Sequence, residues 1–136
     1  MRKLILTLTA VLVVAGLASQ AASAQACTQR DLSYIQLKQS NGYIVGLGAQ
    51  NGSQFNGRVS LSRYGSGWVQ PFSGGFMQGW TYQGRFTATI YWDFGASGSY
   101  EGTIDYWGHV HGTTYDRRNT ASSASFDSTR NARCVY

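Results

Sequence analysis

Hydrophobic and polar residues alternate along several short segments of this chain. In Arg85–Trp92, whose sequence is RFTATIYW, every second residue from Phe86 to Trp92 is apolar, and threonine or tyrosine lies between them. A period of two places alternate side chains on opposite faces of an extended chain. The pattern therefore predicts a β-strand whose Phe86–Trp92 face lies against a core.

Similar short segments recur at intervals of 8–12 residues, separated by glycine-rich turn signals. The expected turns are Asn41-Gly42, Asn51-Gly52, Asn56-Gly57 and Gly65-Ser66-Gly67. The nine expected strands are Tyr34–Lys38, Tyr43–Gly48, Arg58–Tyr64, Trp68–Phe72, Gly75–Trp80, Arg85–Trp92, Ser99–Asp105, His109–Tyr115 and Ala121–Asp127.

No linker or change in composition divides residues 25–136, so we expect a single domain there. The chain has 17 glycines and one proline, Pro71, and it is rich in tyrosine and tryptophan. This composition favours short strands and tight turns over helices. The expected fold class is all-β: an antiparallel meander that closes into a small barrel or sandwich of about eight or nine short strands.

One hairpin can be predicted with its register. Asp105-Tyr106-Trp107-Gly108 has the composition of a tight turn with Gly108 in the left-handed conformation. Ile104 then lies across from Val110, and Asp105 across from His109. Every even-numbered residue of both strands stays on the apolar side, which supports this pairing.

The stretch FTATIYWDFGASGSYEGTIDYWGHVHGTTYDR contains this hairpin. It resembles small exported bacterial proteins that share a tail of the form W…G.Y.GTI…G.V.GTTYDR. The resemblance covers about a third of the chain, implies a β-meander and brings no catalytic residues. The architecture is also similar to the lipocalin–avidin group of barrels, although that group's opening Gly-x-Trp signature and closing arginine pattern are not matched.

The first 24 residues have the three parts of a secretory signal peptide. Arg2 and Lys3 precede the uncharged run Leu4–Ala18, and Ala22-Ser23-Ala24 is a small-residue cleavage site. The apolar run is shorter than the roughly 20 residues that a membrane-spanning helix needs. We therefore expect cleavage after Ala24, no transmembrane anchor, and a secreted or periplasmic protein.

The chain has two cysteines, Cys27 and Cys134. In an oxidising compartment an even number of cysteines indicates a disulfide, which here would tie the two ends of the domain together. A second cleavage point just before Cys27 leaves a lipoprotein with an acylated Cys27 as the alternative.

The charge gives little support to a nucleic-acid partner. Arg2 and Lys3 would leave with the signal peptide, so the formal net charge falls from +5 to +3. The remaining basic residues are scattered and form no stripe. We expect no nucleic acid and no cofactor, and a monomer.

Four polar residues form the first candidate site: Glu101, Asp105, His109 and His111. The expected register brings them to the face opposite the core. Two imidazoles and a carboxylate could ligate a metal or work as an acid/base pair. A solvated strand face explains the same residues, and it is the interpretation we favour, so no metal is expected.

Aromatic rings at expected turns form the second candidate. Tyr106 and Trp107 lie at the tip of one turn, and Phe94 lies in another. Exposed rings on turns are common anchors for a partner, although rings folded over the end of the barrel would cap it instead.

The sequence thus favours a non-enzymatic, exported binding or accessory protein. Its exposed aromatic turns or its barrel mouth would bind a carbohydrate, a small ligand or a protein. One alternative is a small hydrolase or metal-dependent enzyme that uses Glu101, Asp105, His109 and His111. The other is a secreted inhibitor or a structural envelope protein.

Overall fold

The structure, a computed structural model, describes residues 27–65 and 67–135, and these residues form eleven strands. The strands are β1 (Arg30–Asp31), β2 (Gln36–Gln39), β3 (Tyr43–Gly46), β4 (Gln50–Asn51), β5 (Gln54–Gly65), β6 (Trp68–Tyr82), β7 (Arg85–Trp92), β8 (Ser97–Ile104), β9 (Val110–Asp116), β10 (Ser123–Ser128) and β11 (Arg133–Cys134). The expected signal peptide, residues 1–24, lies outside the described residues. None of the described segments forms a helix that could span a membrane.

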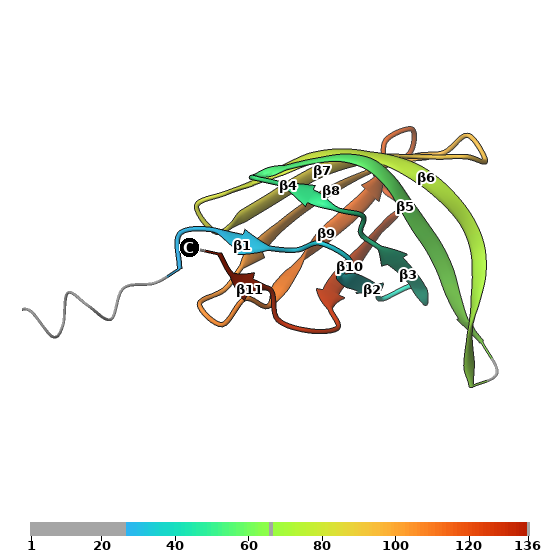
Figure 1. The fold of residues 1–136 in the computed structure, drawn as a ribbon. Coiled ribbons are helices and arrows are strands. Elements are labelled where there is room, and N and C mark those ends of the chain that lie inside the picture. Colours follow the sequence, from blue (N-terminus) through green and yellow to red (C-terminus); the bar gives the residue numbers. More distant parts are fainter. Residues whose placement is uncertain (1–26, 66, 136) are drawn as a thin grey trace, which may run out of the picture.

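The main sheet is an antiparallel barrel of eight strands (Figure 1). Its neighbours run in the order β3-β2-β10-β9-β8-β7-β6-β5, and pairing of β3 with β5 closes the circle. The short β4 is an additional strand on β5. The predicted all-β class is confirmed, and of the two predicted architectures the chain forms the barrel.

The predicted register of the β8–β9 hairpin is confirmed. Ile104 pairs with Val110 and Thr103 with His111. The amide of Gly108 donates to the carbonyl of Asp105 at 3.0 Å, and Gly108 has a φ of 95°. Alternation along this hairpin therefore fixes which side chains enter the barrel.

The barrel interior is filled by apolar side chains from most of the strands. Phe86 lies at its centre, with its ring edge-on to Phe55 at 6.1 Å and to Phe126 at 6.2 Å. Around these rings pack Leu37, Val45, Val59, Leu61, Met77, Ala88, Ile90, Ile104 and Val110. This part of the barrel is a packed core.

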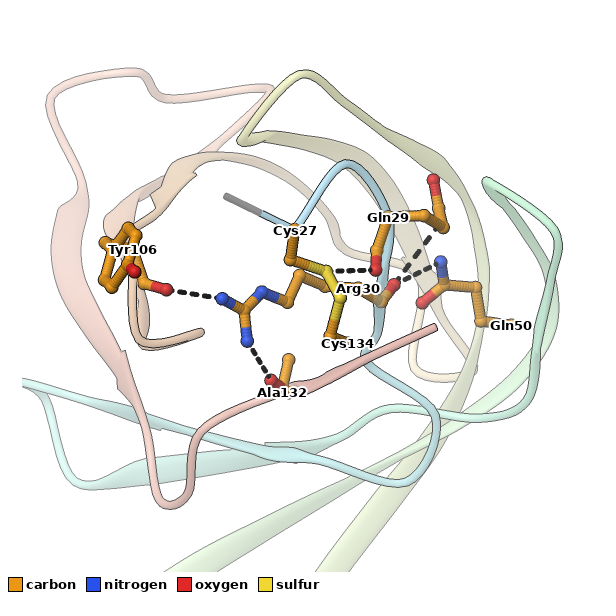
Figure 2. Close-up of a disulfide and its surroundings, with 7 residues drawn as sticks. All are labelled: Cys27, Gln29, Arg30, Gln50, Tyr106, Ala132 and Cys134. Carbon is orange, nitrogen blue, oxygen red and sulfur yellow. Dashed lines mark hydrogen bonds between the residues drawn. A yellow bond between two sulfur atoms is a disulfide. The ribbon is translucent and has the colours of Figure 1, made fainter. Parts of the chain in front are cut away.

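One end of the barrel is closed by the two ends of the domain. The short strands β1 and β11 pair with each other beneath the barrel, next to the buried Leu32, Ile35 and Ala132 (Figure 1). The Arg30 side chain donates to the carbonyls of Ala132 and Tyr106, and the Gln50 side chain donates to the Arg30 carbonyl (Figure 2). The Gln50 side-chain oxygen accepts the amide of Leu32.

A disulfide joins Cys27 to Cys134 at this closed end, with their Cα atoms 5.7 Å apart (Figure 2). The predicted pairing is confirmed. The alternative of an acylated Cys27 is wrong for this structure, because the sulfur of Cys27 is already bonded to Cys134.

Two details of the expected strands are wrong. Asn56-Gly57 is no turn; it lies inside β5, paired with Gln78 and Met77. The expected strands Trp68–Phe72 and Gly75–Trp80 are one 15-residue strand, β6. Pro71 fits there because it lies at a β-bulge, where a missing backbone donor costs little.

The first expected strand also begins too early. Tyr34 has a φ of 61° and lies in a turn, and β2 starts at Gln36. The two-residue strands β1, β4 and β11 were not predicted. Two residues are too few to show an alternating pattern, and these strands depend on contacts between distant parts of the chain.

Candidate functional site: the barrel mouth

The end of the barrel opposite the disulfide is hollow. A cavity of about 290 Å³ opens there, which we call the mouth cavity. It lies where β2, β7 and β9 end and where β3, β8 and β10 begin. Its principal lining residues are Gln39, Tyr43, Leu61, Phe72, Trp92, Phe94, Tyr100, Thr114 and Asp116.

Aromatic rings form a continuous wall on one side of the mouth cavity. The ring of Phe72 meets Tyr43 edge-on at 5.7 Å and Phe94 edge-on at 5.9 Å. The ring of Phe94 also stacks parallel to Trp92, with centroids 6.4 Å apart. Four rings from three separated parts of the sequence thus support one another around the opening.

A β-bulge in β6 brings Phe72 to this wall. Leu61 of β5 pairs with Ser73 and Ser62 pairs with Pro71, so Phe72 has no partner on β5. A bulge turns an extra residue toward the same face as its neighbour and bends the strand. Here it aims the ring of Phe72 over the mouth.

The floor of the mouth cavity is polar and uncharged. The buried Gln39 amide donates to the Tyr100 hydroxyl at 2.7 Å, and Tyr100 also bonds Thr114. Burial raises the pKa of Tyr100 above its ordinary value, and the hydrogen bonds with Thr114 and Gln39 oppose that shift. Tyr100 is therefore a neutral hydroxyl at physiological pH.

Among the described lining residues, Asp116 is the one that carries a formal charge. Asp116 is the last residue of β9, and its carboxylate accepts a hydrogen bond from the Arg118 amide at 2.9 Å. The interior of the cavity therefore offers aromatic faces and neutral hydrogen-bonding groups to a ligand.

Replacing Tyr100 by phenylalanine tests this floor. Tyr100→Phe removes the acceptor of the Gln39 amide and leaves a buried donor without its partner, so we expect a loss of about 1–3 kcal/mol in the free energy of unfolding. Tyr91→Phe is the matched control, because the Tyr91 hydroxyl contacts only the exposed Arg117 side chain, and it should change stability by less than about 0.5 kcal/mol. Urea unfolding at pH 7 measures both; equal effects would contradict this account of the floor.

The contribution of the Tyr100 hydroxyl to stability depends on pH in a defined way. Because the pKa of Tyr100 is raised in the folded protein, the stability that its neutral hydroxyl supplies is complete below about pH 10, the unfolded value. This contribution is lost as the pH rises above the unfolded value toward the pKa of Tyr100 in the folded protein. The difference in the free energy of unfolding between the natural protein and Tyr100→Phe should therefore narrow above pH 10. A constant difference would contradict a raised pKa of Tyr100.

The predicted aromatic turn residues are separated by the structure. Phe94, which is 57% exposed, lies at the mouth. Tyr106 and Trp107, exposed by 64% and 70%, lie at the closed end, where the Tyr106 carbonyl accepts a hydrogen bond from Arg30 (Figure 2). Their rings contact each other edge-on at 5.7 Å and do not cap the barrel.

The predicted polar set does not converge on a cleft. His109 bonds the carboxylate of Asp127 at 2.9 Å, rather than that of Asp105. The Asp105 carboxylate accepts the backbone amides of Trp107 and His109 and so holds the turn. The two imidazoles stack at 5.8 Å, and the described residues contain no group of three or more potential metal ligands.

Comparison with protein-family models, curated proteins and solved structures finds no match to this chain.

The barrel mouth was predicted as a possible binding site, but most of the residues that line it were not. Trp92 was expected to be a buried core residue, but it is only partly buried and lines the opening. Gln39, Tyr43, Phe72, Tyr100 and Thr114 were not proposed at all. A signal was present: the predicted register already placed Tyr100 across from Thr114, on the inner face and at the strand ends nearest Trp92.

Proposed function

We propose that this protein is a non-enzymatic binding protein that holds one compact, uncharged, amphiphilic small molecule in the mouth cavity. The observation that carries this proposal is the cavity itself, an opening of about 290 Å³ with aromatic walls and a neutral hydrogen-bonding floor. Binding sites for small molecules are typically apolar clefts of roughly 300–1,000 Å³ with a few polar groups that orient the ligand. The mouth lies at the small end of that range.

The lining defines the chemistry of the ligand. The stacked pair Trp92 and Phe94 suits a flat apolar face, because aromatic pairs gain from parallel or edge-on contact. At the floor, Gln39 and Thr114 suit one hydroxyl or carbonyl group. A charged ligand would lose its hydration without gaining an opposite charge inside, so an uncharged ligand is favoured.

The alternatives fit the structure less well. An enzyme built on Glu101, Asp105, His109 and His111 needs those groups to converge, and Asp105 is instead bonded to the backbone of its own turn.

We further propose that the protein acts outside the cytoplasm, after removal of residues 1–24. The Cys27–Cys134 disulfide is consistent with an oxidising compartment.

The test is calorimetric titration of the disulfide-bonded protein with 2-naphthol, a flat molecule with one hydroxyl. At about −0.5 kcal/mol per non-hydrogen atom we expect a Kd of roughly 0.1 mM. Naphthalene-2-sulfonate has the same ring and a charge in place of the hydroxyl, and it should bind at least tenfold more weakly.

Matched variants locate the binding. Phe94→Ser removes an exposed ring of the mouth, and it should weaken 2-naphthol binding by about tenfold, as expected for an aromatic anchor. Tyr106→Ser removes a similarly exposed ring at the closed end and should leave binding unchanged. Equal effects of the two substitutions, or no binding of 2-naphthol by the natural protein, would refute the proposal.

A further inference from the structure

The hairpin formed by β5 and β6 continues beyond the wall of the barrel (Figure 1). The last β6 residue that pairs with β7 is Gly75, and the last β5 residue that pairs with β3 is Arg63. From Tyr64 and Val69 outward β5 and β6 pair with each other, and the Tyr64 amide also donates to the Gly42 carbonyl at 3.2 Å. We call Tyr64, Trp68 and Val69 the hairpin tip.

The hairpin tip exposes large apolar side chains. Tyr64 is 55% exposed, Trp68 57% and Val69 45%. These side chains do not line the mouth cavity. Exposed apolar side chains that cluster in this way are typical of surfaces that meet a partner, a ligand or a membrane.

Two cations lie close to the hairpin tip, Lys38 and Arg63. Between Asp31 and Asp93 the sequence has no acidic residue, but Asp127 of β10 lies directly across from Lys38. The Lys38 ammonium lies over the ring of Tyr64 at 5.9 Å, and the Arg63 guanidinium lies over the ring of Tyr43 at 5.7 Å.

Arg58 differs from these cations because its guanidinium is paired with the Asp93 carboxylate. Lys38 and Arg63 make no salt bridge with a carboxylate among the described residues. Arg63, which pairs with the uncharged Tyr43 and Gln70, and Lys38, which pairs with Asp127, thus lie at the base of the hairpin tip.

We propose that the hairpin tip docks on an anionic phospholipid bilayer. Tryptophan and tyrosine have amphipathic rings that favour the interface between water and hydrocarbon. Lys38 and Arg63, lying just behind the tip, would face the anionic headgroups. This interaction goes beyond the proposed ligand binding, because the tip and the mouth cavity share no residue.

The geometry predicts weak, reversible and salt-dependent binding. Three side chains bury little area, so the tip alone anchors the protein loosely. Attraction between the two cations and the headgroups is screened by salt beyond about a Debye length. Neutral bilayers should therefore bind the protein more weakly than anionic ones.

The experiment is co-sedimentation with vesicles of phosphatidylcholine and phosphatidylglycerol in a 3:1 ratio, and with vesicles of phosphatidylcholine alone. The protein used in this experiment begins at Gln25, because the apolar run Leu4–Ala18 would itself bind lipid. All described strands and both cysteines lie within the retained residues. We expect binding to the anionic vesicles, reduced at least fivefold on neutral ones.

Matched substitutions separate the tip from the rest of the surface. Trp68→Ser should lower binding to anionic vesicles about tenfold, and Trp107→Ser, at the opposite end of the barrel, should leave it unchanged. Arg63→Gln should lower binding roughly fivefold on anionic vesicles only, whereas Arg133→Gln in β11 should not. Trp68→Ser should still bind 2-naphthol, which keeps this test independent of the proposed function.

Three results would overturn the proposal. The natural protein could fail to sediment with anionic vesicles, Trp68→Ser could bind as well as the natural protein, or Trp107→Ser could reduce binding as much as Trp68→Ser. Quenching by lipids brominated along their acyl chains provides a second measurement. In the natural protein these lipids should quench the fluorescence of Trp68. Quenching of equal size in Trp68→Ser, which lacks that residue, would also contradict the proposal.

Discussion

Replacing both Cys27 and Cys134 by serine is expected to lower the free energy of unfolding by about 4–5 kcal/mol. The disulfide joins residues 107 positions apart, and in the chain-entropy model a loop of about 100 residues contributes roughly 4.7 kcal/mol. Most of the domain lies between the two cysteines, so without the bond the unfolded chain regains nearly all the freedom that the loop removed.

The measurement is urea unfolding of the double serine variant beside the oxidised natural protein. The natural protein, reduced and alkylated under denaturing conditions and then refolded, is a control that should approach the stability of the variant. A loss below about 1 kcal/mol would contradict the account, because it would mean that closing this loop removes little freedom from the unfolded chain.

The second large effect is expected at the centre of the core. Phe86 is 1% exposed and lies edge-on between Phe55 and Phe126, so Phe86→Ala removes a ring that three strands pack around. Burial and the cavity left behind together predict a loss of about 3–5 kcal/mol.

Phe94→Ala is the matched control for this substitution. The same ring is removed, but from a position that is 57% exposed at the mouth, and the loss should stay below about 1 kcal/mol. Urea unfolding of the two variants provides the comparison. If Phe94→Ala were as destabilising as Phe86→Ala, the mouth would be part of the core and no longer a binding cavity.

Alternation and turn chemistry were enough to predict the walls of the barrel. Arg85–Trp92 was predicted with the bounds that the structure has, because both its faces show a clear period of two. The β8–β9 register followed from Gly108 and from the need to bury Ile104 and Val110. The disulfide followed from the number of cysteines.

The closed end and the mouth could not be predicted in the same way. Pairing of β1 with β11 joins residues about a hundred positions apart, and a two-residue strand has no periodic pattern. The mouth gathers Gln39, Phe72 and Thr114 from distant strands. Which strand ends meet there depends on how the barrel closes, through β3 and β5.

The candidate residues chosen from the sequence were those that local patterns make conspicuous. Tyr106 and Trp107 are exposed as expected, but they lie at the end opposite the cavity. His109 and His111 do lie together, yet the carboxylate that bonds His109 comes from Asp127 in β10. Pairing of β9 with β10 decided that contact, and the register predicted for the β8–β9 hairpin could not reveal it.

The most direct test of the central claim is nuclear magnetic resonance of isotope-labelled protein titrated with 2-naphthol. Chemical-shift changes should concentrate on the Gln39 side-chain amide, the ring of Phe94, and the resonances of Tyr100 and Thr114, all at the mouth. The turn that contains Tyr106 and Trp107 should not respond. Shifts confined to that turn, or saturating shifts that leave the Gln39 amide unmoved, would contradict a ligand site in the barrel mouth.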